Sequence, residues 1–252
     1  MLDLLGAYDL SSTQWILLGC CGAIVGMSKT GVAGVYNVTL PILAIIFGGK
    51  DSTGVLLPIL LMADLFGVAY YNRATDWSYI RKIFPWAFVG ILIGTWVGDS
   101  LSDQWFNRLL AGVILLGIAV MLFMEFRKNK SVPDHWWFAG LMGLLAGFTT
   151  MVGNAAGPIM AVYLLAMRLP KNTYIGTQAW FFLLINLSKL PFHIFVWDTI
   201  SPASLLLDFS LLPAIGIGAA IGIWIIKHIS DGFYRKFIII VTILSTFLLF
   251  FK

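Results

Sequence analysis

The sequence predicts an all-α integral membrane protein, because apolar residues dominate it, charges are scarce and long hydrophobic runs recur along it. Of its 252 residues, 60% are hydrophobic and 11% are charged, and the mean hydropathy is +0.91. A soluble domain carries charge on about a quarter of its residues, and a chain of this length could not bury so much apolar surface in one core. We therefore expect lipid to cover the excess.

Ten apolar runs are the predicted membrane segments. They cover approximately residues 13–27, 35–47, 52–71, 83–98, 105–126, 136–151, 158–167, 173–197, 208–226 and 233–251. A spanning helix needs about 20 residues, and the first, second, sixth and seventh runs are shorter than that. A glycine-rich break separates the two members of each short pair. Each pair is therefore expected either to cross the membrane twice or to form a re-entrant hairpin.

The distribution of Lys and Arg predicts the orientation. If all ten segments cross, 11 of the 16 Lys and Arg fall on one side and 3 on the other, while Lys29 and Lys189 lie inside the membrane. The side with more positive charge should be cytoplasmic, which places both termini outside. Two re-entrant hairpins would leave this assignment unchanged. Because residues 1–12 contain no Lys or Arg, we expect no cleaved signal peptide.

The chain also repeats itself. A shift of 128 residues brings Pro85, Gly90, Gly94, Trp96 and Ser102-Asp103 onto Pro213, Gly218, Gly222, Trp224 and Ser230-Asp231. A shift of 121 to 122 brings Gly19, Gly22, Gly26, Gly31, Lys50 and Asp64 onto Gly140, Gly143, Gly147, Gly153, Lys171 and Asn186. Each half has an odd number of crossings, so the halves should be inserted in opposite senses, as in many secondary transporters. The prediction is an inverted repeat of two five-segment halves, 1–130 and 131–252, that form one transport domain.

The two breaks, residues 26–34 and 147–158, are the predicted binding elements. A helix should begin after each break, and a helix N-terminus favours an anion through its unpaired N–H groups and dipole. Irregular backbone at membrane depth is tolerated only when it is buried in protein or lines a wet cavity. The glycines and neutral donors expected to line an anion site are Ser28, Thr30, Gly31, Gly34, Asn37, Thr149, Thr150, Gly153, Asn154 and Gly157.

Three ionisable residues at membrane depth matter most: Lys29 lies in the first break, Asp64 in the third apolar run and Lys189 in the eighth. A charge at the bilayer centre costs on the order of 3 kcal/mol on insertion scales, so such residues usually face the protein interior and serve a function. In one assignment Lys29 and Lys189, with Asn186 nearby, bind an anionic substrate. In another, Asp64 and Lys189 form a structural ion pair. Asp64 is also a candidate site for a coupling proton or cation, and His193 for a proton relay, although a hydrogen-bonded structural histidine is the simpler interpretation.

Other classes of function find less support in the sequence. The three His residues are widely spaced, and the sequence contains no H-E-x-x-H, no Cys cluster and no Gly-x-Ser-x-Gly, so neither an enzyme nor a metal or cofactor is predicted. No nucleic-acid-binding motif is present. The partners expected are the lipid bilayer and a small anion. A secondary permease, a passive anion channel and a carboxylate transporter remain open, as does a homodimer.

The paired breaks, Lys50-Asp51, Lys171-Asn172 and the run Asn186-x-x-Lys189-x-Pro191 together resemble the TauE/SafE sulfite exporter family over about residues 12–251. The resemblance implies a permease of the bacterial cytoplasmic membrane that moves sulfite or small organosulfonates, with two glycine-rich motifs at its centre. The first break departs from the family pattern, because its glycines are thinned to Gly31-Val-Ala-Gly34 and Lys29 lies within it. The resemblance therefore leaves the substrate of this chain open.

Overall fold

The computed structural model describes residues 8, 10–102, 104–105, 108–109, 112, 136–234, 236–238 and 240, and these residues form helices and connecting turns without any strand. Three stretches are long and apolar enough to span a bilayer: Gly49–Ala74, Trp77–Asp99 and Trp136–Gly153. They contain α4 (Gly49–Tyr71), α5 (Trp77–Asp99) and α7 (Trp136–Gly153). A fourth candidate span is the pair α10 (Pro202–Ser210) and α11 (Leu212–Lys227), which is bent by 46°. The chain is thus a multi-pass membrane protein.

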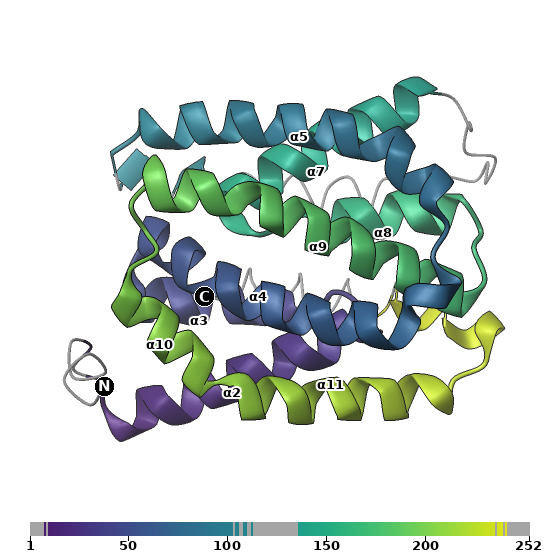
Figure 1. Cartoon of the computed structure of the whole chain (residues 1–252), viewed down its shortest axis with the longest axis horizontal. Helices are drawn as coiled ribbons and strands as arrows, with labels where there is room; N and C mark the ends of the chain where they lie inside the picture. The colour runs from purple at the N-terminus through teal and green to yellow at the C-terminus, as the bar shows by residue number, and fades with distance from the viewer. Residues whose placement is uncertain are drawn as a thin grey trace.

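The short helices double back within the protein. In Figure 1, α2 (Ser12–Lys29) runs inward from the left, and α3 (Thr39–Phe47) lies back at the left, where α4 begins. A 3-10 helix, η1 (Val35–Val38), joins them. On the opposite side, α7 enters from the right, and α8 (Gly157–Ala166) returns to the right, where α9 (Lys171–Phe195) begins. The expected break within each short pair is therefore present.

The predicted segment 208–226 is wrong in its extent. The helical path begins earlier, at Pro202, because Ser201 caps α10 through a hydrogen bond from the backbone N–H of Ser204, and Pro202 lies in the first turn. The path then breaks at Leu211 before α11 begins. Most of the predicted segments 105–126 and 233–251, and the boundary between the two halves at residue 130, lie outside the described residues.

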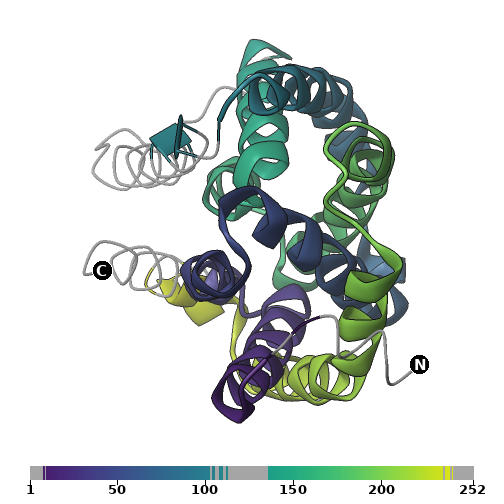
Figure 2. The same ribbon diagram turned by 90° about the vertical axis from the view of Figure 1, so that its left-hand side faces the viewer.

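Close helix packing places the elements around the centre. The helix α5 packs along α7, α11 along α2, and α4 along α9. Glycine allows the backbones of the first two pairs to touch. A Cβ atom on Gly147 would collide with the carbonyl of Ala87, and one on Gly218 would collide with the carbonyl of Ala23. Figure 2, viewed from the left-hand end of Figure 1, shows α5 and α9 close to end-on.

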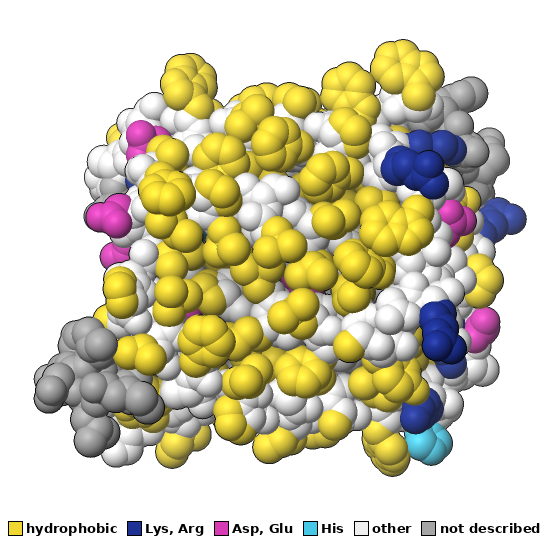
Figure 3. Space-filling view, viewed as in Figure 1, with side chains coloured by type: hydrophobic (Ala, Val, Ile, Leu, Met, Phe, Trp, Pro, Cys, Tyr) yellow, Lys and Arg dark blue, Asp and Glu magenta, His cyan; other side chains and the backbone are white. Residues whose placement is uncertain are grey.

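The surface has the pattern of a membrane protein. Figure 3 shows a broad band of hydrophobic side chains across the middle of the molecule, with Lys and Arg gathered at the right-hand end. In Figure 1, α4 and α11 end there and α9 begins there. Large apolar side chains within the helices, such as Trp96 (75% exposed) and Trp224 (63% exposed), face outward. Lipid would cover this band.

Candidate functional site

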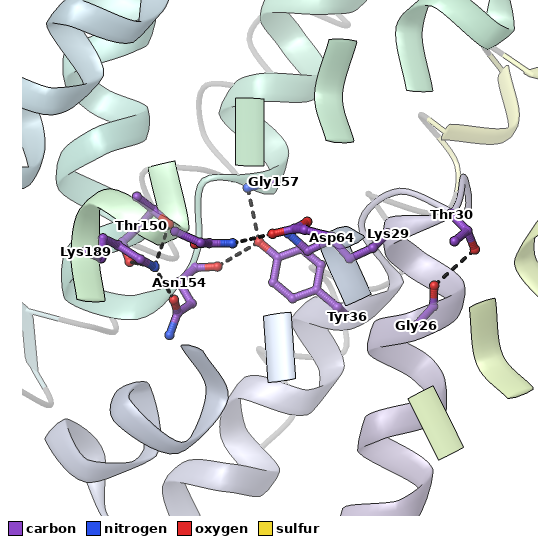
Figure 4. A network of polar contacts seen from close by, with 10 residues as sticks. Gly26, Lys29, Thr30, Tyr36, Asp64, Thr150, Asn154, Gly157 and Lys189 are labelled. Atoms are coloured by element: carbon purple, nitrogen blue, oxygen red, sulfur yellow. Dashed lines mark hydrogen bonds and ion pairs between the residues drawn. The ribbon is translucent and has the colours of Figure 1, made fainter. Parts of the chain in front are cut away.

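The two breaks in the helices meet in the interior of the protein. The Tyr36 hydroxyl in η1 donates a hydrogen bond of 2.7 Å to the backbone carbonyl of Asn154. The backbone N–H of Gly157, at the start of α8, donates to the same tyrosine oxygen at 3.3 Å. Tyr36 and Asn154 are almost completely buried, and Figure 4 shows them together at the centre of a polar network.

The first break takes its shape from glycine, as expected. The helix α2 ends at Lys29, and the Thr30 hydroxyl turns back to donate to the carbonyl of Gly26 at 3.0 Å. Gly31 and Gly34 follow with φ values of 140° and 92°. Residues that carry a Cβ atom rarely adopt such positive φ values, whereas glycine adopts them at little cost. These two glycines therefore let the chain leave α2 and begin η1 within five residues.

The second break takes its shape from asparagine instead. Gly153 is the last residue of α7 and Gly157 the first of α8, while Asn154 between them has a φ of 53°. Asn is among the few residues with a side chain that tolerate this conformation. The backbone N–H of Ala155 then donates to the carbonyl of Thr149 at 3.2 Å, which closes the end of α7. Pro158 lies in the first turn of α8, as predicted.

An ion pair joins two helices next to the breaks. Lys29 Nζ lies 2.9 Å from Asp64 Oδ1, and both side chains are buried. The Asn186 amide donates to Asp64 Oδ2 at 2.6 Å, and Lys29 Nζ also lies 4.0 Å from the centre of the Phe182 ring. The partner of Asp64 is therefore Lys29 and not Lys189, because α2 ends against α4 and delivers Lys29 to the carboxylate.

Lys189 has a different environment. Its Nζ donates to the backbone carbonyl of Thr150 at 3.1 Å, to the Thr150 hydroxyl at 3.2 Å and to the Asn154 side-chain oxygen at 2.5 Å. The Asn154 amide in turn donates to the backbone carbonyl of Thr53 at 3.1 Å. Lys189 is completely buried. The second break therefore wraps around this ammonium group with neutral oxygens.

The charges of this centre do not balance. Lys29 is paired with Asp64, but among the described residues no carboxylate lies within 4 Å of Lys189 Nζ. With all three groups ionised, the centre carries one positive charge in excess. Neutral oxygens solvate an ammonium only in part, and an uncompensated buried charge is costly.

The match to a known family assigns this centre to a transport protein. The family described as Sulfite exporter TauE/SafE matches residues 18–249. The chain belongs to the TauE/SafE family. No curated protein and no solved structure matches it. The polar network of this TauE/SafE protein thus lies inside a membrane transporter whose family is named for sulfite export.

Several predicted site residues lie at the network and others lie away from it. Asn37 follows Tyr36 and is buried, and neither its side-chain nitrogen nor its oxygen has a hydrogen-bond partner within the described part of the chain. The Thr30 hydroxyl donates to the carbonyl of Ala219 in α11 at 3.0 Å, and Figure 4 shows its contact with Gly26 apart from the network.

The remaining predicted residues make local contacts. Thr149 donates to the carbonyl of Ala146 at 3.2 Å, within its own helix. Ser28 is buried at the end of α2. His193 Nδ1 lies 2.8 Å from the Thr199 hydroxyl oxygen, one turn beyond Lys189 along α9. For these three residues the structure gives no direct contact with the charged groups of the centre.

Three contributors to the centre of this TauE/SafE protein were not predicted from the sequence. Tyr36 joins the two breaks, Thr53 accepts from Asn154 through its backbone, and the Phe182 ring packs against the Lys29 ammonium. The position of Tyr36 two residues after Gly34, directly after a break at membrane depth, is the one signal that could have marked it. A backbone carbonyl and a phenylalanine in an apolar helix give no such signal.

Proposed function

We propose that this chain is a secondary permease for a small anion such as sulfite or an organosulfonate, which binds near the bilayer midplane beside Lys189. The observation that carries the proposal is the buried ammonium of Lys189, which is held by Thr150 and Asn154 and has no carboxylate partner in the described part of the chain. An anion that replaced part of the Asn154 contact would supply the missing charge. The close attraction between the Lys189 ammonium and the anion then offsets the free-energy cost of removing both from water.

The surrounding groups fit a small oxyanion. The Asn37 amide is a buried donor without a partner among the described residues, and the backbone N–H of Gly157 at the start of α8 already donates to a hydroxyl oxygen, that of Tyr36. The Thr150 hydroxyl and the Asn154 side chain lie at the Lys189 ammonium, and polar groups of this kind match the several oxygens of a sulfite or sulfonate group. The neighbouring Lys29–Asp64 pair adds no net charge, so it would tune the geometry of the site and leave its charge unchanged.

Equivalent contacts in the two halves support the inverted repeat that we propose for the whole chain. A Cβ atom on Gly147 would meet the carbonyl of Ala87, and one on Gly26 would meet the carbonyl of Ile215. Gly26 and Gly147 are equivalent under the shorter shift, and Ala87 and Ile215 under the shift of 128 residues.

The same two sequence shifts relate a second pair of glycine contacts. A Cβ atom on Gly218 would meet the carbonyl of Ala23, and one on Gly90 would meet that of Leu144. Asp64 and Asn186, which are also equivalent in sequence, bond directly to each other. An axis that exchanges the halves would pass close to such a self-equivalent contact, and transport would proceed by movement of one half against the other around the anion.

The orientation follows from the same proposal. In the inner membrane of a bacterial cell, the end rich in Lys and Arg in Figure 3 would lie on the cytoplasmic side. Both termini would lie on the outer side. The long helices α4 and α9, which carry Asp64 and Lys189, connect the two ends past the binding site. Export and uptake would use the same site, with the gradients setting the direction.

Transport by the purified protein in liposomes tests the proposal. We expect sulfite uptake that saturates with concentration, and counterflow when unlabelled sulfite is placed inside. Lys189→Met should lower both the saturable uptake and the counterflow. Lys50→Met, which removes a lysine at the start of α4, should leave uptake and counterflow near the wild-type level. Flux that does not saturate and shows no counterflow would identify a passive channel and contradict the permease.

A further inference from the structure

A second buried carboxylate lies at the bend between α10 and α11. Asp208 is completely buried, and neither of its side-chain oxygens has a hydrogen-bond partner within the described residues. It lies on the inward face of α10 with Ser204 and Leu207, which are also buried. This carboxyl belongs neither to the anion site nor to any capping interaction.

The depth of Asp208 makes its state unusual. It is six residues from Pro202, which corresponds to about 9 Å along a helix axis at the usual rise of 1.5 Å per residue. An ionised carboxylate at such a depth requires a cation or several donors, and without them the neutral acid is the stable form. The structure therefore holds Asp208 where a bound proton is strongly favoured.

The charged groups of the helices packed against α10 are already engaged or distant. Both α4 and α11 contact α10. On α4, Lys50 lies 3.6 Å from Asp99, and Asp64 pairs with Lys29, while Asp51 is exposed. On α11 the one charged residue is Lys227, at its last position, which lies over the Tyr70 ring. None of these cations lies within 4 Å of the Asp208 carboxyl.

The bend between α10 and α11 lies within one helical turn of Asp208. The path turns by 46° between α10 and α11, and Leu211, the residue between them, is three positions after Asp208. Movement about this residue would turn the inward face of α10 toward the end of the molecule where α10 begins, shown at the left in Figure 1. Residues at the ends of secondary-structure elements often act as hinges.

We propose that Asp208 carries the proton that couples anion transport to the pH gradient, and that the bend at Leu211 controls its access to the outer aqueous side. The proposal rests on the permease function proposed above. In the buried state the carboxyl holds its O–H bond. When the bend opens, that bond breaks, the proton passes to water and the carboxylate remains until it is protonated again. For one proton to cross in each cycle, the carboxylate takes its next proton from the cytoplasmic side after the two halves have moved against each other, and the ion pair at Asp64 takes no part.

Infrared spectroscopy of the purified full-length protein tests the protonation directly. A protonated carboxyl gives a C=O band that shifts in heavy water. We expect such a band at neutral pH in the wild type, its loss in Asp208→Asn, and its retention in Asp231→Asn, which removes a carboxylate that is 68% exposed. A neutral-pH spectrum that is the same in the wild type and Asp208→Asn would overturn the proposal.

Transport in liposomes tests the coupling. With sulfite as the probe, we expect a pH gradient to drive accumulation by the wild type and by Asp231→Asn. In Asp208→Asn, accumulation should fall to the level seen without a gradient, while counterflow at equal pH continues. The pH gradient changes the protonation of sulfite equally for both variants. A difference in accumulation between Asp208→Asn and Asp231→Asn therefore reports a property of the protein. Accumulation by Asp208→Asn that still follows the gradient would contradict the proposal. If no variant moves sulfite, the permease function fails, whereas the infrared result for Asp208 stands separately.

Discussion

Two buried lysines, similar in sequence context, have opposite roles in the charge balance of the centre. Lys29 is neutralised by Asp64 at 2.9 Å, whereas the hydrogen bonds of Lys189 within the described residues go to the oxygens of Thr150 and Asn154. The loss of either partner of a buried ion pair leaves the other charge without compensation. The first pair should therefore determine stability, and Lys189 should determine anion binding.

Asp64→Asn should destabilise the protein strongly. It keeps the shape of the side chain but leaves the Lys29 charge unpaired, which costs about 3–5 kcal/mol for a buried pair. The free energy of unfolding in detergent measures the effect. Asp99→Asn is the matched control, because the Asp99 side chain is 50% exposed beside Lys50, and this substitution should cost about 0–1 kcal/mol. Lys29→Met combined with Asp64→Asn should recover much of the loss. A stability for Asp64→Asn equal to that of Asp99→Asn would argue against a charged pair.

Tyr36→Phe should separate the two breaks. The change removes the hydroxyl between the Asn154 carbonyl and the Gly157 N–H, and unpaired buried polar groups cost about 1–3 kcal/mol. Tyr79→Phe is the control, because Tyr79 is only partly buried and packs through its ring. Thermal unfolding should show a clear decrease for Tyr36→Phe alone, and equal melting temperatures for the two variants would refute this role of the hydroxyl.

At this scale the sequence predicted three of the buried charged residues, but it did not single out Asp208 and did not show how the charges pair. A Lys or Asp at membrane depth is expected to face the interior, so Lys29 in the first break, and Asp64 and Lys189 in apolar runs, could be selected from the sequence. The choice of Lys29 over Lys189 as the partner of Asp64 depends on the packing of α2 against α4. That packing depends on contacts between distant residues, for which local sequence carries no signal.

At the scale of the elements, the helix breaks and the glycine contacts position the site. The helices α2 and α7 end inside the protein and are each held against another helix, α11 and α5, by backbone contact at glycine. The glycine-rich breaks predicted where these helices end. The bend at Leu211 was not predicted, because 208–226 reads as one apolar run, although Pro213 in the first turn of α11 is a signal for it.

Alanine at the contact glycines should destabilise the protein. Gly147→Ala and Gly218→Ala each place a methyl group against a backbone carbonyl, of Ala87 and Ala23 respectively, and overpacking typically costs about 1–3 kcal/mol. At Gly19 the added Cβ meets nothing within 4 Å, so Gly19→Ala should be neutral or gain up to about 1 kcal/mol from helix propensity. Unfolding in detergent distinguishes the cases. A tolerated Gly147→Ala would mean that α5 and α7 lie further apart than described.

At the scale of the whole molecule, the two ends differ in charge and the middle is apolar (Figure 3). Composition predicted the membrane class, and the family match confirms it. The inverted orientation of the halves remains a proposal that rests on equivalent contacts. Hydropathy locates apolar runs but does not distinguish a crossing segment from a re-entrant one, since both have the same composition.

Cysteine labelling tests the orientation. Ser100 follows α5 at one end and Ser230 follows α11 at the other, and both are exposed. With Cys20 and Cys21 replaced by Ala, we expect a membrane-impermeant maleimide to label Ser100→Cys in intact cells and Ser230→Cys only after the inner membrane is opened. The reverse pattern would place the Lys- and Arg-rich end outside.

The central claim is that the uncompensated charge of Lys189 binds the anion where the two breaks meet, and anion-dependent thermal stability tests it most directly. A ligand that binds the folded state stabilises it by mass action, about 2.7 kcal/mol at a concentration 100 times its Kd. We expect the melting temperature of the wild type and of Lys50→Met to rise with sulfite or sulfonate concentration, and the response of Lys189→Met to require about 10- to 100-fold more anion. A dose response in Lys189→Met that matches the wild type would contradict the claim.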